Sequence, residues 1–198
     1  MNERFPFPIP NGWFSVGFSH ELKPGDVKPV RYFGRDLVLF RDEDGDPHLL
    51  EAFCPHLGAH LGHGGRIEGK EIVCPFHAWR FDGTGACTGI PYSKRVPRRA
   101  KLERFILREQ NNMLLAWHHL ENKPPLWDPP VFPECDPDNE EYSEFVYRQW
   151  TVNTCNQEMA ENAVDTAHFM YLHGTAEMPV TTAKIINEHH MHLSLIHI

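Results

Sequence analysis

Two short Cys/His pairs constrain the fold of this 198-residue chain more than any other feature. Cys54 and His56 form the first pair, and Cys74 and His77 form the second. A proline follows each cysteine, which is typical of loops rather than of helices or central strands. Thiolate and neutral imidazole are good ligands for iron and zinc. The sequence therefore predicts two loops that together present a metal site.

The order of the ligands favours one kind of metal site over another. Two Cys and two His can hold tetrahedral zinc. A zinc finger, however, has two neighbouring Cys followed by two His on a helix, whereas each half is mixed here. A mixed order suits a two-iron cluster in which one iron takes both Cys and the other takes both His. We therefore prefer a [2Fe-2S] cluster, and a zinc-binding interaction module stays an alternative.

The segments 54–59 and 74–82 resemble the Rieske domain of ring-hydroxylating oxygenases. Respiratory Rieske proteins carry one further Cys in each cluster loop, but this chain has Ala59 and Phe76 at those places. The resemblance is thus to the oxygenase and ferredoxin branch. It implies a β-sandwich with the cluster between two loops, held by Cys54, His56, Cys74 and His77.

Composition excludes several functional classes. Lys and Arg number 19 and Asp and Glu 27, giving a net charge of −8, which argues against a nucleic-acid binder. The 41% hydrophobic content suffices for a packed core. No apolar run reaches the roughly 18 residues of a membrane span. The first residues lack a signal-peptide pattern, and the odd count of five Cys argues against a disulfide framework, so we expect a cytoplasmic protein.

Short apolar runs between turns dominate the first 118 residues and predict an all-β unit. Strands are expected at 36–41, 48–53, 71–73 and 112–117, and turns at 42–46 and 82–85. Proline is frequent in residues 121–139 and disfavours regular structure there. We expect a Rieske domain at 1–120, a linker at 121–144 and a second domain at 145–198. The predicted fold class is α+β, an all-β Rieske domain followed by the start of an α+β helix-grip catalytic domain.

A second group of ligands lies in the second domain. Residues 145–152 alternate like a strand, and a helix is expected from a cap at Asn153 or Thr154 to about Phe169. Asp165 and His168 are three residues apart and would share a face of that helix. His173 could reach the same ion if the helix ends near residue 171.

The spacing of Asp165, His168 and His173 resembles the iron motif of Rieske oxygenase catalytic domains. The resemblance implies that His168 and His173 bind mononuclear Fe(II). It also implies that Asp165 is catalytic, linking His168 to a cluster His of a neighbouring subunit. Two His and a carboxylate form the triad of non-haem iron oxygenases. Glu161 either supports this site or is a solvated helix residue, and the second interpretation is preferred.

The third iron ligand of the family, a carboxylate, normally lies far downstream. Glu177 and Glu188 are available acids, but neither occupies that place. We expect residues 184–192 to form one strand with solvent-facing His. The segment 193–198 resembles the translation of a transposase adapter used in sequencing libraries. This predicts a truncated catalytic domain whose native reading frame continues differently after residue 192.

The resemblance implies an oxygenase α-subunit that activates O2 to hydroxylate or desaturate an apolar small molecule. Electrons would come from NAD(P)H through a ferredoxin, a ferredoxin reductase or both, and the family implies a homotrimer. The segments 90–92 and 96–97 resemble ketosteroid hydroxylases and cholesterol desaturases, so a steroid or polycyclic aromatic substrate is expected. The alternative is a Rieske ferredoxin-like electron-transfer protein with an additional segment.

Overall fold

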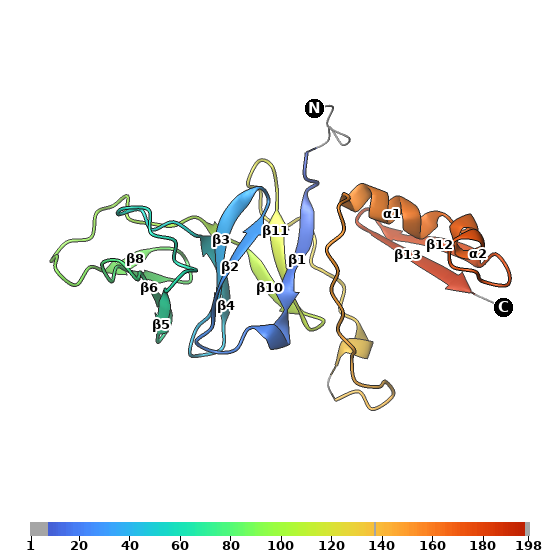
Figure 1. Cartoon of the computed structure of the whole chain (residues 1–198), viewed down its shortest axis with the longest axis horizontal. Helices are drawn as coiled ribbons and strands as arrows, with labels where there is room; N and C mark the ends of the chain where they lie inside the picture. The colour runs from blue at the N-terminus through green and yellow to red at the C-terminus, as the bar shows by residue number, and fades with distance from the viewer. Residues whose placement is uncertain (1–7, 137, 197–198) are drawn as a thin grey trace. The chain divides into compact units, whose positions relative to one another are not determined.

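The computed structural model describes residues 8–136 and 138–196. Three parts of the chain lie outside the described residues. They are residues 1–7, Pro137 of the proline-rich segment, and residues 197–198 of the segment that resembles a translated adapter. The chain divides into two compact units, one formed by Phe7–Ser143 and one containing Glu144–Ile198. Figure 1 shows both, and each is described here by itself.

The described residues of the first unit form three antiparallel sheets. One has the order β1 (Gly12–Phe18), β11 (Met113–His118), β10 (Leu107–Gln110). Another has the order β2 (Val27–Tyr32), β3 (Arg35–Arg41), β4 (Pro47–Glu51), β9 (Arg104–Phe105). The third has the order β5 (Arg66–Glu68), β6 (Glu71–Val73), β7 (Arg80–Asp82), β8 (Cys87–Gly89). Short 3-10 turns lie at Ser19–Glu21 and Pro133–Cys135. The β-rich first unit agrees with the predicted fold class.

Strand β3 separates two hydrophobic cores, which explains its uninterrupted apolar sequence. Successive side chains of a strand point to opposite faces of the sheet. Val38 and Phe40 accordingly pack in one core, and Leu37 and Leu39 pack in the other. The first of these cores also contains both predicted ligand cysteines. The metal loops therefore rest directly on the core of the unit.

The turn between β3 and β4 lies where the sequence predicts it. The N–H of Asp42 donates to the carbonyl of Asp46 at 3.0 Å, and Gly45 has a left-handed φ of 95°. Beside this turn, the almost buried guanidinium of Arg41 donates to the carbonyls of Leu22 and Gly45. Arg41 also pairs with the carboxylate of Glu109 at 2.7 Å. These bonds tie β10 and the β3–β4 turn together.

The second unit contains helices α1 (Asn156–Val164) and α2 (Ala167–Tyr171) and the hairpin β12 (Val180–Asn187) and β13 (His190–Ile196). The prediction of a strand at 145–152 was wrong: the segment is exposed and pairs with no strand among the described residues. The prediction of one strand at 184–192 was also wrong, because the chain turns at residues 188–189 and pairs β12 with β13. No described helix is long and apolar enough to span a membrane.

Candidate metal centres

The two Cys/His loops have the same backbone hydrogen bonds. In the first loop the N–H of Cys54 donates to Ala59 O at 2.9 Å, and Gly58 N–H donates back to Cys54 O at 2.9 Å. In the second loop Cys74 N–H donates to Trp79 O at 2.8 Å, and the N–H of residue 78 donates to Cys74 O at 3.1 Å. Each loop is thus closed by two backbone hydrogen bonds around its cysteine.

Both loops turn through a left-handed residue at the same position. Gly58 has φ 74° and Ala78 has φ 54°. Glycine adopts this conformation freely, whereas a residue with a Cβ pays about 1–2 kcal/mol for it. Ala78 therefore holds a strained backbone that the second loop needs in order to present its histidine.

The two loops bring the imidazoles of His56 and His77 together. Their ring centroids are 4.6 Å apart, with 74° between the ring planes. The Nδ1 atoms of both rings are buried and have no hydrogen-bond partner among the described residues. Buried polar atoms are rarely left without a partner, so each such atom needs an explanation. A metal ion that binds the lone pairs of both Nδ1 atoms would explain why neither atom has a hydrogen-bond partner.

The two predicted ligand cysteines are buried. Cys54 and Cys74 are each only 2% exposed. Burial and the adjacent thiol of Cys74 raise the pKa of the Cys54 thiol to about 12. A thiol in such surroundings stays protonated at neutral pH unless a cation stabilises the thiolate, as a coordinated metal does. Cys54 is therefore unsuited to act as a nucleophile and suited to metal binding.

The four donors fit a two-iron cluster. The two buried thiols and the two unpartnered imidazole nitrogens are two chemically distinct pairs of donors. A cluster of this kind takes one iron for each pair, with both thiolates on one iron and both imidazoles on the other. Tetrahedral zinc also takes two Cys and two His, so the zinc-binding module stays the alternative.

Trp79 and Tyr92 form a supporting layer for the first cluster loop that the sequence did not predict. The indole of Trp79 stacks on His56 with ring centroids 4.7 Å apart and 9° between planes. Its Nε1–H donates to the hydroxyl of Tyr92 at 2.7 Å. Trp79 thereby fixes the plane of the His56 ring. The sequence could have indicated this role, because an aromatic residue two positions after His77 lies within reach of the cluster loops.

The second predicted site lies where the expected single helix breaks. Helix α1 ends at Val164, and the carboxylate Oδ1 of the next residue, Asp165, accepts the N–H of Ala167 at 3.1 Å. Helix α2 begins there, so Asp165 and His168 lie on either side of the break and not on one continuous helix face. The Nδ1 of His168 lies 2.5 Å from the carbonyl of Asp165 and 3.9 Å from its carboxylate. With Nδ1 donating to that carbonyl, Nε2 is left as the metal-binding nitrogen of His168.

The end of α2 brings His173 towards His168. The last helical residue is Tyr171, and Gly174 reverses the chain with φ 69°. The two imidazole centroids are then 5.2 Å apart. The sequence predicts that His173 can reach the same ion as His168 if the helix ends near residue 171. The structure has a helix end at that position.

Glu161 does not join this pair in the described contacts. Its carboxylate accepts a hydrogen bond from Gln157 at 2.9 Å, one turn back along α1. Its backbone carbonyl accepts the N–H of Asp165. The residue is exposed, as expected of a solvated helix position. Glu177 and Glu188, the other acids considered for the iron, are exposed as well.

Comparison with known families gives two matches that cover most of the chain. Residues 12–105 match the model of the Rieske [2Fe-2S] domain. Residues 116–196 match the model of the 3-ketosteroid 9alpha-hydroxylase C-terminal domain.

Curated relatives match across both segments. The chain is 41% identical over 172 residues to a cholesterol 7-desaturase of Drosophila melanogaster, covering 85% of this chain and 39% of that protein. It is 33% identical over 190 residues to the oxygenase component of a 3-ketosteroid-9-alpha-monooxygenase of Rhodococcus rhodochrous, covering 93% of this chain and 48% of that protein. The chain thus spans less than half the length of these relatives.

Solved structures show the same likeness. Dicamba monooxygenase bound to dicamba superposes with a TM-score of 0.54 at 28% identity, over 64% of this chain and 40% of that chain. The reduced complex between oxygenase and ferredoxin in carbazole 1,9a-dioxygenase gives a TM-score of 0.52 at 27% identity, over 60% of this chain and 31% of that chain.

Proposed function

We propose, from the premise that this chain belongs to the Rieske oxygenase family, that it serves as an oxygenase component acting on an apolar small molecule. Cys54 and Cys74 would hold one iron of a [2Fe-2S] cluster. His56 and His77 would hold the other iron through Nδ1. The observation that carries this proposal is the pair of buried Nδ1 atoms without hydrogen-bond partners, on the same two loops as two buried thiols.

His168 and His173 would hold a mononuclear Fe(II), with a further carboxylate as third ligand. When bound, the cluster supplies one-electron transfer and the Fe(II) supplies the activation of O2. Asp165 acts as a positioning residue in this proposal. Its carbonyl holds Nδ1 of His168 and its carboxylate starts helix α2, so the imidazole keeps one tautomer and one orientation.

The substrate and partners are proposed from the relatives. The two curated relatives described above are named for cholesterol and a 3-ketosteroid, so a steroid is the proposed substrate class. Electrons would come from NAD(P)H through a ferredoxin or a reductase, and a homotrimer is the proposed assembly. Five free cysteines support a reducing, cytoplasmic location.

The cluster proposal is tested by reconstituting the full chain with iron and sulfide under anaerobic conditions. We expect a coloured protein with a reduced-state EPR signal and a potential above that of all-Cys clusters. The variant His77→Cys should lower the potential, since thiolate replaces imidazole. The matched variant His63→Cys changes an exposed histidine of the same region and should leave the potential unchanged. A colourless, zinc-loaded protein would instead support the interaction-module alternative.

The oxygenase proposal is separated from the ferredoxin alternative by the iron content. With Fe(II) in excess, we expect a third iron on His168 and His173 of the wild-type chain, held more weakly than the cluster irons because the carboxylate ligand is lacking, and two irons in His168→Ala, because the cluster stays intact. His192→Ala on the exposed face of β13 serves as the control and should keep the third iron. Two irons in all three proteins would favour the electron-transfer alternative.

A further inference from the structure

A cavity of about 290 Å³ lies in the first unit, beside β9 and the end of β11. It is lined by three short stretches of chain, residues 103–106, 117–119 and 122–123. This volume is near the lower limit for small-molecule sites, which suits a ligand of one or two fused rings. The lining contains none of the residues proposed to bind iron.

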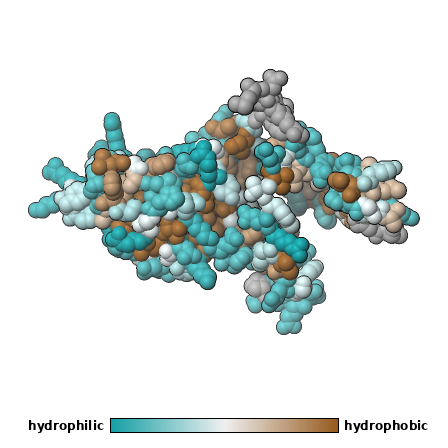
Figure 2. Space-filling view, viewed as in Figure 1, coloured by the Kyte–Doolittle hydropathy of each residue, from teal (hydrophilic) through white to brown (hydrophobic). Residues whose placement is uncertain are grey.

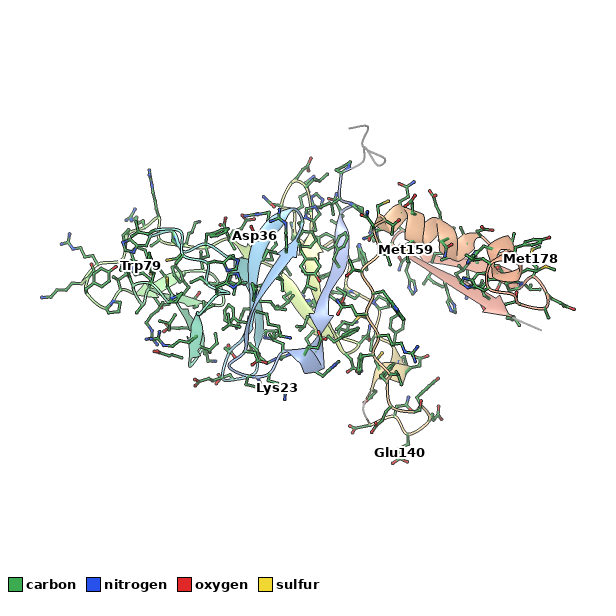
Figure 3. All side chains as sticks on the ribbon, viewed as in Figure 1. Lys23, Asp36, Trp79, Glu140, Met159 and Met178 are labelled. Atoms are coloured by element: carbon green, nitrogen blue, oxygen red, sulfur yellow. The ribbon has the colours of Figure 1, made fainter. Side chains whose placement is uncertain are left out.

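The cavity lies apart from the two cysteine loops. The carboxylate of Glu103, in its lining, pairs with Arg35 at the start of β3 at 2.8 Å. Figure 3 shows the next residue of β3, Asp36, apart from Trp79, which stacks on His56 of the first loop. The cavity is therefore a feature separate from the proposed cluster.

Flat aromatic side chains form much of the lining. Trp117 is only 6% exposed, and its Nε1–H donates to the carbonyl of Lys123 at 2.8 Å. The ring of His119 stacks on this indole, with centroids 6.3 Å apart and 28° between the planes. The guanidinium of Arg35 lies over the ring of Phe105, 5.2 Å from its centroid. Such rings favour a planar aromatic ligand, because ring pairs add attraction to the burial of apolar area.

The wall formed by residues 119–123 is fixed by its own hydrogen bonds. The N–H of Asn122 donates to the carbonyl of His119 at 2.9 Å, and Asn122 has a left-handed φ of 53°. The N–H of Glu121 donates to Nδ1 of His119 at 3.1 Å. In the neutral imidazole the proton is then on Nε2, which can donate a hydrogen bond. Small-molecule sites are usually pre-formed in this way.

The lining also carries positive charge that the described acids do not neutralise. Glu103 is already paired with Arg35. Arg104 is exposed and forms no ion pair with a described residue. Lys123 pairs with Glu121, but their side chains are 59% and 67% exposed, and such a pair is weak. An anionic group therefore suits this lining.

The shape of the cavity marks the site better than surface hydropathy does. Figure 2 shows hydrophobic residues scattered among hydrophilic ones on the visible face of the first unit. Scattered apolar residues are normal on protein surfaces and need no partner. A concave lining with aromatic walls and a few polar groups is, in contrast, the usual composition of a small-molecule site.

We propose that this cavity binds a small aromatic acid, a planar ring system that carries one carboxylate. The carboxylate would pair with the guanidinium of Arg104, which can donate two parallel hydrogen bonds to it. The ring system would lie against Trp117 and Phe105. No bond forms or breaks, so this is a binding site and not a second catalytic centre. It goes beyond the proposed function, because it uses no iron ligand.

The test uses indole-3-carboxylate as the probe and the full chain without added metal. Binding is followed by saturation-transfer NMR at about 0.02 M NaCl, where charges are little screened. We expect saturable binding with a Kd of about 1 mM or lower. Indole-3-carboxamide has the same shape without the charge and should bind about tenfold more weakly. In isotope-labelled protein, the amide resonances of residues 104–106 and 117–123 should shift.

Three variants locate the anion within the cavity. Arg104→Gln should weaken binding of the carboxylate about tenfold and change binding of the carboxamide less than twofold. Arg104→Lys keeps the charge but loses the paired donors, so an intermediate loss is expected. Arg108→Gln removes an exposed cation of β10 outside the lining and should change the affinity less than twofold.

Several outcomes would overturn the cavity proposal. Equal affinity for the carboxylate and the carboxamide would do so, as would equal losses in Arg104→Gln and Arg108→Gln or the lack of saturable binding. Shifts confined to residues 161–173 would assign the acid to the proposed iron site instead. Because the titration needs no metal, the cluster proposal can fail while the cavity site stands, and the reverse also holds.

Discussion

The imidazole of His56 lies parallel to the indole of Trp79, with ring centroids 4.7 Å apart and 9° between the planes. Tyr92 holds the other edge of this indole through its hydroxyl. The indole therefore fixes the ring plane of the proposed iron ligand. Side chains that orient a metal ligand typically change metal affinity by about 10–100-fold when they are altered.

Replacing Trp79 should therefore loosen the cluster without removing a ligand. We expect Trp79→Leu to lose its reconstituted cluster to a chelator about tenfold faster than the wild type, followed by visible absorption. Tyr92→Phe, which removes only the hydrogen bond, should have a smaller effect in the same direction. Trp150→Leu is the matched control, because Trp150 is 73% exposed. Equal rates in Trp79→Leu and Trp150→Leu would refute the positioning role.

The left-handed residue of each cluster loop predicts opposite effects of two substitutions. Ala78→Gly should stabilise the protein by about 1 kcal/mol, because it relieves the positive φ. Gly58→Ala should destabilise it by a similar amount through the backbone, since a Cβ there meets no atom within 4 Å. Urea unfolding of both variants measures these changes. Gly12→Ala, at a position without positive φ, is the control.

The pair between buried Arg41 and partly exposed Glu109 should matter more than a fully exposed pair of the same kind. Arg41→Met breaks this pair and removes the hydrogen bonds to the carbonyls of Leu22 and Gly45. We expect a loss of about 2 kcal/mol in the free energy of unfolding, mainly from the carbonyls that lose their donor. Arg31→Met breaks the pair between Arg31 and Asp36, in which the two side chains are 66% and 39% exposed. This variant should lose less than about 1 kcal/mol in the free energy of unfolding. Similar losses in both variants would contradict this expectation.

The buried carboxylate of Asp42 predicts an acid-sensitive first unit. Burial opposes its ionisation, but hydrogen bonds from His48 and the backbone of Asp46 outweigh burial and hold its pKa below the ordinary 3.8. A lowered folded-state pKa contributes stability above the unfolded-state value, which is lost as pH falls through the folded-state pKa. Unfolding midpoints should therefore decline below about pH 4. Asp42→Asn should flatten that part of the profile, and an unchanged slope would exclude Asp42 as the cause.

Much of the first unit follows from local sequence. The apolar run at 37–40 becomes β3 because both of its faces are buried, and the Asp/Gly-rich segment 42–46 becomes the turn after it. The paired loops were recognisable because metal chemistry requires specific residue types at specific spacings. The strain at Ala78 was not predictable, since nothing in the residue type indicates a positive φ.

The second unit was harder to predict, for reasons visible in single residues. Asp165 interrupts the expected helix because its carboxylate accepts the N–H of Ala167, so a side chain competes with the helical backbone bonds. The sequence did not predict the turn at residues 188–189, because the turn contains neither Gly nor Pro. The alternation of apolar and polar residues at 145–152 indicated a strand. Such alternation does not supply the partner strand that a sheet requires.

The two backbone hydrogen bonds that close each cysteine loop make the two loops equivalent parts of the unit. In each loop the N–H of the cysteine donates to the carbonyl five residues later, and the carbonyl of the cysteine accepts the N–H of the residue four positions later. Because each loop has its own pair of bonds, a substitution that breaks the pair around Cys54 should displace that thiol and leave the loop of Cys74 in place.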